Sequence, residues 1–291
     1  MSFPALELIA WPYHGGLRDV SMGLGGSVLA ADQELRAGIA AADLSVTVET
    51  IPPVDESLPE VARVFELDRR LARRVAAACA RDAFPLVLGG NCCSCLGTVA
   101  GAGADGVVWF DAHADFDTTD DNLSGFTDVF GLAILTGTGW RALRETIPGF
   151  APVPEKRVVL AAVRDLEPYQ RERLEASAVR TVPGAFDRGA LAAALDALAG
   201  GTARVYLHVD LDALDAGVGR ANPYAAPGGP SLDALLDGIG AVFDRFTVTS
   251  AALTAYDPRV DDDGAIADSA RRITALIARR VAHQRLTRAR H

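Results

Sequence analysis

Two short clusters of acidic residues have the residue types and the spacing that metal chelation requires. Asp111, His113 and Asp115 alternate along the chain, so their side chains point the same way where the chain is extended. Asp210 and Asp212 repeat this spacing further along. Confining these acids together would be strongly unfavourable without cations. The clusters therefore predict two divalent ions bridged by carboxylates, an arrangement that produces hydroxide at neutral pH.

Either cluster alone has a second interpretation, because Asp is also common in turns and at helix caps. Each cluster, however, directly follows an apolar run, VVWF before Asp111 and VYLHV before Asp210. Two such clusters together favour the metal-site interpretation.

The elements that position these clusters follow from an alternation of apolar runs with helical patterns. The expected strands are Leu6 to Trp11, Ser45 to Ile51, Phe84 to Leu88, Gly106 to Phe110, Arg157 to Val163, Val205 to Val209 and Thr247 to Ala255. The expected helices are Glu60 to Arg81, Leu191 to Leu198, Leu232 to Phe243 and Ser269 to Arg285. This alternation predicts an α/β fold, a three-layer sandwich with a mostly parallel central sheet flanked by helices. No low-complexity linker interrupts it, which predicts a single domain over residues 1–291.

In sheets of this kind, ligands bind at the carboxyl ends of the strands. Polar clusters follow four of the expected strands at that edge: Asn91 to Cys93, Asp111 to Asp115, Asp210 to Asp212 and Tyr256 to Pro258. The sequence therefore predicts one site built from all four. His208 precedes the third cluster within its strand and is expected in the core or beside the ligands.

Three motifs together resemble a known group of enzymes. GGN-C ends at Cys92, DAHAD spans Asp111 to Asp115, and HVDLDALD…NPYAAPGG runs from His208 to Gly229. This pattern resembles the ureohydrolase superfamily of arginase, agmatinase and formiminoglutamase over nearly the whole chain. The resemblance implies an arginase-like fold and a binuclear manganese centre that hydrolyses guanidinium or formimino carbon–nitrogen bonds.

The resemblance also implies roles for the individual ligands. Asp111 and Asp210 would bridge the two metal ions. Asp115 would complete the shell of one ion, and His113 with Asp212 that of the other.

Cys92 departs from the family, which usually has a His at this position. A thiolate binds divalent ions, but it is softer than imidazole and favours zinc or iron over manganese. We therefore expect two divalent ions, manganese first, with Zn²⁺ or Fe²⁺ as alternatives. A Cys here also resembles the hydroxyarginine-hydrolysing branch of the family. The other interpretation of Cys92 is a small buried apolar residue at a helix start.

The positions that handle protons also differ. Where the family has a proton-shuttling His, this chain has Asp128, whose carboxyl has an ordinary pKa about two units below that of imidazole. His14, in the loop after the first expected strand, is a candidate replacement. A loop His is also commonly a plain hydrogen-bonding residue.

The resemblance assigns three residues to the substrate. Asp117 and Ser124 follow the DAHAD motif, and Glu167 lies where arginase-like enzymes hold an α-amino group, although it is also readable as a solvated loop acid. The family's Glu that grips the guanidinium is replaced by Ala255. Asp257 or Asp117 could compensate, or the substrate is an amide, amidine or imine instead of a guanidinium.

The predicted function is a metal-dependent hydrolase acting on non-peptide C–N bonds of a guanidino, hydroxyguanidino or amidine-type small molecule through a metal-bridging hydroxide. The alternative is a non-catalytic arginase-fold binding or assembly protein with an altered or lost metal site. A third interpretation is thiol chemistry in the run from Cys92 to Cys95. Metal stoichiometry separates the first two.

Composition limits the partners. The formal net charge of −10 argues against nucleic acid and anionic membranes. No stretch reaches the roughly 18 apolar residues of a membrane span, and no basic secretory lead opens the chain. The close spacing of Cys92, Cys93 and Cys95 is unlike a disulfide framework. We expect a cytoplasmic protein with a small-molecule substrate and, from the resemblance, a homo-oligomer.

Overall fold

The computed structural model describes residues 5–122 and 124–288, with side chains up to residue 284. Its centre is an eight-stranded sheet in the order β4-β1-β5-β10-β9-β6-β7-β8, and every neighbouring pair is parallel. The strands are β1 (Ala5–Trp11), β4 (Ser45–Thr50), β5 (Ala83–Gly89), β6 (Gly106–Phe110), β7 (Val158–Ala161), β8 (Arg180–Val182), β9 (Arg204–Asp210) and β10 (Thr247–Thr254). A short antiparallel hairpin, β2 (Tyr13–His14) and β3 (Leu17–Arg18), follows β1.

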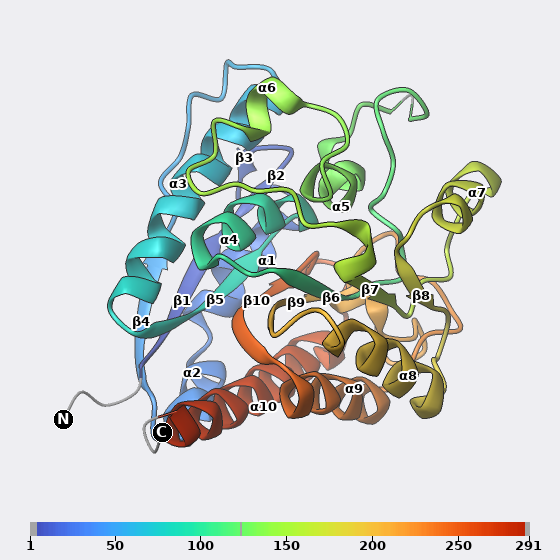
Figure 1. The fold of residues 1–291 in the computed structure, drawn as a ribbon. Helices are drawn as coiled ribbons and strands as arrows, with labels where there is room; N and C mark the ends of the chain where they lie inside the picture. The colour runs from blue at the N-terminus through green and yellow to red at the C-terminus, as the bar shows by residue number, and fades with distance from the viewer. Residues whose placement is uncertain (1–4, 123, 289–291) are drawn as a thin grey trace.

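Helices cover both faces of the sheet (Figure 1). They are α1 (Gly23–Ala31), α2 (Gln33–Ala40), α3 (Glu60–Ala80), α4 (Cys95–Ala102), α5 (Gly131–Leu135), α6 (Arg141–Arg144), α7 (Pro168–Ala176), α8 (Arg188–Ala199), α9 (Leu232–Arg245) and α10 (Ala265–Arg288). One apolar core lies between the sheet and α3, α4 and α5, and a second lies between the sheet and α2, α8, α9 and α10. The three-layer α/β sandwich with a parallel sheet is confirmed.

Sequence pattern explains the best-predicted elements. In α3, Val64, Leu67, Leu71 and Val75 are buried at spacings of three and four residues, which is the apolar stripe of an amphipathic helix. β7 ends earlier than expected because Ala162 adopts a left-handed conformation with φ 75°. No helix in the described part of the chain combines the length and apolar character that crossing a membrane requires.

The parallel register brings the polar clusters to one edge. Val209 of β9 pairs with Phe110 of β6 and with Leu253 of β10, and Leu253 pairs in turn with Leu88 of β5. The residues that follow these four positions therefore emerge side by side at the carboxyl ends of the strands.

A buried acid lies at the contact between α3 and α4. Asp68 of α3 is fully buried, and its Oδ1 accepts a hydrogen bond from the Gly97 N–H in the first turn of α4 at 3.0 Å. An acid suits the free N–H groups at the start of a helix. Its other oxygen, Oδ2, has no hydrogen-bond partner among the described residues.

This acid makes the stability of the protein depend on pH. Burial raises the pKa of Asp68 well above its ordinary value. The native carboxyl therefore keeps its proton at pH values where the unfolded chain has lost it, so native stability falls as pH rises through this interval. Each unit of raised pKa corresponds to about 1.4 kcal/mol. Asp68→Asn keeps the acceptor oxygen, and we expect it to be more stable than wild type at pH 8. Its gain in the free energy of unfolding over wild type should be at least about 1 kcal/mol larger at pH 8 than at pH 5.

Urea unfolding midpoints at the two pH values measure this difference. Asp120→Asn, at an exposed position, is the matched control and should follow the wild type. If the urea midpoints of wild type and Asp68→Asn change with pH in parallel, the buried Asp68 carboxyl is not the cause of the pH dependence of stability.

Candidate metal centre and active site

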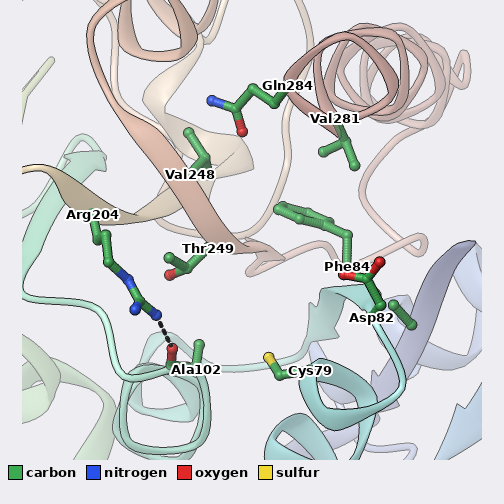
Figure 2. Close-up of a pocket in the computed structure, with 10 residues that line it drawn as sticks. Cys79, Asp82, Phe84, Ala102, Arg204, Val248, Thr249, Val281 and Gln284 are labelled. Carbon is green, nitrogen blue, oxygen red and sulfur yellow. Dashed lines mark hydrogen bonds between the residues drawn. The ribbon is translucent and has the colours of Figure 1, made fainter. Parts of the chain in front are cut away.

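One cavity lies at the amino ends of the strands of the sheet, and another lies at their carboxyl ends. The larger, of about 470 Å³, lies where β5, β9 and β10 begin, and its lining includes Phe84, Arg204 and Val248 (Figure 2). It contains none of the residues that the sequence singled out. The other cavity, of about 370 Å³, lies at the carboxyl ends of the strands. It is lined by all six predicted metal ligands, Cys92, Asp111, His113, Asp115, Asp210 and Asp212, and by His14, Ser124 and Asp128.

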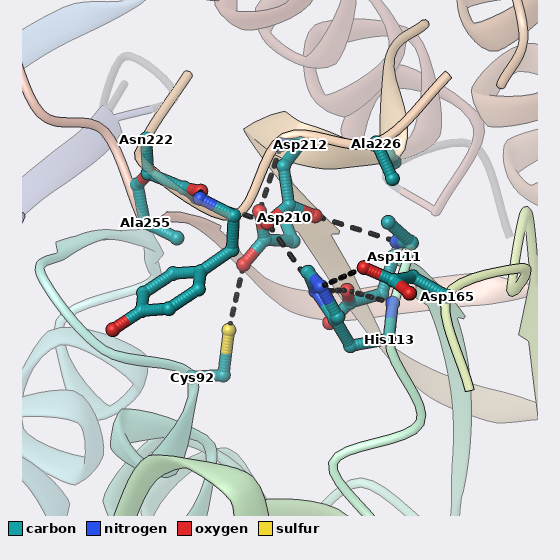
Figure 3. Close-up of polar contacts among 12 residues, drawn as sticks. Cys92, Asp111, His113, Asp165, Asp210, Asp212, Asn222, Ala226 and Ala255 are labelled. Atoms are coloured by element: carbon teal, nitrogen blue, oxygen red, sulfur yellow. Dashed lines mark hydrogen bonds and ion pairs between the residues drawn. The ribbon is translucent and has the colours of Figure 1, made fainter. Parts of the chain in front are cut away.

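The candidate ligands face one another across the strand ends (Figure 3). The Cys92 thiol donates to Asp210 Oδ2 at 2.9 Å. His113 Nδ1 lies 3.4 Å from Asp111 Oδ1 and 3.4 Å from Asp212 Oδ2. These contacts join residues from three different strand ends into one cluster.

The donor atoms form overlapping groups of the size that holds a metal ion. The first group is Cys92, Asp111, His208 and Asp210, the second Cys92, Asp115 and Asp128, and the third Asp111, His113 and Asp212, with the atoms of each group within 4.8 Å of one another. Asp115 Oδ2 is buried and has no hydrogen-bond partner among the described residues. A buried carboxylate oxygen without a donor is unfavourable unless a cation or proton meets it, so the cluster fits divalent ions.

Electrostatics support the same conclusion. Burial, together with Asp111 and Asp128, raises the pKa of Asp115 well above its ordinary value. Burial and the neighbouring Asp212 and Asp111 do the same for Asp210. Burial alone would lower the pKa of His113, but the adjacent Asp212 and Asp111 raise it above the usual range. Each shift shows that the cluster needs positive charge, which protons or metal ions can supply.

A buried layer of side chains lies beneath the ligands. Trp109 Nε1 donates to Asp111 Oδ2 at 2.8 Å, and the Trp109 ring stacks on His208 with the centroids 3.5 Å apart. His208 Nε2 lies 3.1 Å from Thr254 Oγ1, which is 3.2 Å from Cys92 Sγ. His208 is thus both in the core and beside the ligands, as expected, whereas Trp109 and Thr254 carried no signal in the sequence beyond their places in strands.

The two candidate proton-handling residues are linked through Asn91. Asn91 Nδ2 donates to Asp128 Oδ2 at 2.5 Å and lies 3.4 Å from His14 Nδ1. Asp128 Oδ1 accepts from the Cys93 N–H at 3.1 Å. Burial raises the pKa of Asp128 to about 7 and lowers that of His14. Both groups line the cavity, and near pH 7 Asp128 is able to exchange a proton.

The predicted substrate residues have different surroundings. Ser124 lines the cavity, with its hydroxyl bonded to Asn122 Oδ1 at 2.5 Å. Among the described residues, the cavity lining does not include Asp117, Glu167 or Asp257.

Each of these three acids is engaged elsewhere. Asp117 accepts hydrogen bonds from Tyr169, Gln170 and Asn122 at 2.8–2.9 Å. Glu167 caps the start of α7 in a capping box with Gln170. Asp257 forms a two-pronged ion pair with Arg259 at 2.7 and 2.9 Å.

Two residues that the sequence analysis did not select hold the site together. Asn222 Nδ2 donates to Asp212 Oδ2 at 2.9 Å and to the Ala255 carbonyl at 3.0 Å. Arg164 binds the chain around Asp212 through several backbone carbonyls. Asn222 stands in the NPYAAPGG motif, so its place in the motif was the available signal.

A parallel α/β sandwich with carboxylates, imidazole and thiol gathered at its strand ends defines a class of protein built to hold divalent cations beside a small cavity. The family described as "Arginase family" matches residues 17–287. The chain therefore belongs to the arginase family, which confirms the resemblance drawn from the motifs.

Individual relatives agree with this assignment. The chain is 30% identical to an arginase of Bacillus subtilis (strain 168) over 152 residues, which is 47% of this chain and 51% of that protein. It is 34% identical to an arginase of Bacillus caldovelox over 131 residues, 43% of this chain and 44% of the other. The matched stretch thus spans about half the length of these curated relatives.

Solved structures match over nearly the whole fold. A crystal structure of arginase from Bacillus subtilis superposes with a TM-score of 0.83 at 24% identity, covering 94% of this chain and 98% of the other. The native arginase from Bacillus caldovelox gives a TM-score of 0.82 at 25% identity, with 95% and 97% covered. Formimidoylglutamase from Bacillus subtilis gives 0.68 at 19% identity, with 96% and 88% covered. The matches below 25% identity support the fold.

Proposed function

We propose that this protein is a metal-dependent hydrolase that cleaves a non-peptide C–N bond of a small molecule, in the class of guanidino, hydroxyguanidino or amidine-type compounds. The observation that carries the proposal is the cluster of six candidate ligands lining one cavity, in which the buried Asp115 Oδ2 has no donor among the described residues. The six candidate ligands would hold two divalent ions, manganese first and zinc or iron as alternatives, and such ions would supply hydroxide at neutral pH and polarise the bond under attack.

The protein's own residues hold these ions and move the protons. Asp111 shares one donor group with Cys92 and Asp210 and another with His113 and Asp212, so Asp111, with Asp210, would hold both ions. Cys92 with Asp115 would complete one side, and His113 with Asp212 the other. Asp128, fixed by Asn91 and the Cys93 N–H, accepts or donates a proton at its carboxyl, and His14 is the second candidate for that role.

The test is metal content by elemental analysis of protein purified without chelator, for the native chain and for Cys92→His. We expect about two divalent ions per chain in both proteins. Zinc or iron in the native chain that changes to manganese in Cys92→His would identify Cys92 as the ligand that selects the metal, because imidazole is harder than thiolate. Cys79→His, at an exposed position on α3, is the control and should leave metal identity unchanged.

Absence of metal from both native and Cys92→His protein would overturn the hydrolase proposal. It would then favour a binding or assembly protein with an arginase fold. With metal present, release of urea or hydroxyurea from guanidino and hydroxyguanidino compounds is the first activity to measure.

A further inference from the structure

Part of the lining of the cavity beside the ligand cluster is apolar, and this part is called the apolar wall. It is formed by Met22, Phe126, Val129, Tyr224 and Ala255. The Phe126 ring lies 5.1 Å from the His14 ring, and Tyr224 lies edge-on to His113 at 6.5 Å between centroids. Tyr224 is 55% exposed, so it stands at the mouth, while Met22 and Ala255 are buried. A substrate in this cavity can therefore contact aromatic and aliphatic surface.

This wall offers no carboxylate for a cation. Ala255 follows β10 directly at the carboxyl end of the strand and lines the cavity, so this position supplies a methyl group and no carboxylate. Asp257, two residues on, is paired with Arg259. Asp117 already accepts three hydrogen bonds and lies outside the lining. The acids that do line the cavity are Asp128, held by two donors, and the candidate metal ligands, so a buried guanidinium would lack its own counter-ion.

Two neutral polar side chains in the lining, those of Asn222 and Gln170, are already engaged. Asn222 donates to Asp212 and to the Ala255 carbonyl, and its Oδ1 accepts from the Tyr224 N–H. Gln170 donates to Asp117 and accepts from the Glu167 N–H. Away from the metal ligands, the lining otherwise offers only the hydroxyls of Ser124 and Tyr224 and the ring of His14 among the described residues, so few polar groups can recognise a polar or zwitterionic substituent.

From these three observations we infer that the substrate is an uncharged amide or urea carrying an apolar, aryl-sized substituent, and that it is not a guanidinium compound. This inference rests on the proposed C–N hydrolase function and replaces the guanidino and amidine substrate classes named there with an amide or urea. The carbonyl would face the ligand cluster, and the substituent would lie against Phe126 and Tyr224. A cavity of about 370 Å³ is at the small end of the range for ligand sites and suits one ring with its amide group.

The reaction balances with water alone. Hydroxyl is added to the carbonyl carbon, the C–N bond breaks, and the departing nitrogen takes the remaining hydrogen as a free amine or ammonia. No oxidant, reductant or other co-reactant is needed.

Phenylurea and phenylguanidine provide the test, because they share ring and shape and differ chiefly in charge near neutral pH. Binding to the metal-loaded native protein is measured by equilibrium dialysis, which needs no turnover. We expect phenylurea to bind at least about 10-fold more tightly than phenylguanidinium, and more tightly than methylurea, which lacks the ring. Tighter binding of phenylguanidinium by metal-loaded native protein would overturn the inference and leave the hydrolase proposal intact, whereas a protein without metal would overturn the hydrolase proposal itself.

Two variants locate the preference in the wall. Ala255→Glu restores a carboxylate and should strengthen phenylguanidinium binding by about 10-fold or more, since charge-assisted pairs are the strong ones. Phe126→Asn should weaken phenylurea binding by about 10-fold and leave methylurea unchanged. Leu58→Asn, at an exposed apolar residue outside the lining, is the control and should change neither. The comparison of the two probes on native protein decides the question even where a variant does not fold.

Discussion

Asp115→Asn is expected to stabilise the metal-free protein and to abolish most of the stabilisation that metal ions give. In the metal-free cluster, burial raises the pKa of Asp115, and the negative charges of the nearby Asp111 and Asp128 raise it further. Removing its charge relieves that repulsion at pH 8. The same change removes a candidate ligand, so affinity at that position should fall by more than about 100-fold. Asn tolerates the left-handed backbone that Asp115 adopts, with φ 48°.

Thermal unfolding with chelator and with excess manganese or zinc measures both effects. A ligand at 100 times its dissociation constant stabilises a protein by about 2.7 kcal/mol, which corresponds to a rise of about 4–5 °C for a chain of this size. We expect that rise for wild type and less than about 2 °C for Asp115→Asn. The control Asp233→Asn, at a side chain that is 83% exposed, should keep the full rise. An equal rise in Asp115→Asn would exclude Asp115 from the metal shell.

The fold was predictable where periodicity and burial agree. The strand before Asp111 and the amphipathic helix α3 follow from apolar runs alone. β8 was missed because it is a three-residue strand, Arg180–Val182, whose first two residues are polar. α1 was missed because its GLGG start disfavours a helix. Its glycines are there for close packing: a Cβ on Gly25 would come within 2.0 Å of the Tyr256 carbonyl, so tertiary contact overrides propensity.

The positions of candidate site residues could be predicted where the sheet fixes them and could not be predicted where they lie in loops. The six candidate ligands sit at the ends of paired strands, so their meeting follows from parallel register. Asp117, Glu167 and Asp257 lie in loops, where a nearby donor decides the direction of each side chain. Position in a motif cannot reveal that Arg259 captures Asp257, or that Glu167 caps a helix. The substrate assignments of these three acids therefore remain predictions, and the geometry gives them little support.

No pattern in the sequence indicated the structural role of Arg164. Its guanidinium donates hydrogen bonds of 2.9–3.1 Å to six backbone carbonyls. One is that of Ala162, just after β7, and the other five lie in the segment after β9, at Asp212, Ala213, Leu214, Ala226 and Pro227. It thus ties the end of β7 to the segment that carries Asp212. A planar fork of donors can bind several carbonyls at once, which a single ammonium group cannot.

Arg164→Lys is accordingly expected to destabilise the protein by about 3–5 kcal/mol, because several carbonyls lose their donor and each unsatisfied buried group costs about 1–3 kcal/mol. Freed from this anchor, Asp212 should shift relative to His113, and metal affinity on that side of the cluster should fall by about 10-fold or more. Urea unfolding of metal-free protein measures the first effect, and competition with a metal-binding dye measures the second. Arg141→Lys, whose side chain is 79% exposed and paired with Glu145, is the matched control and should change neither quantity. If Arg164→Lys lowers stability but leaves metal affinity unchanged, Arg164 stabilises the fold without positioning Asp212. Because Arg164 donates a hydrogen bond to the Asp212 carbonyl itself, we expect stability and metal affinity to fall together.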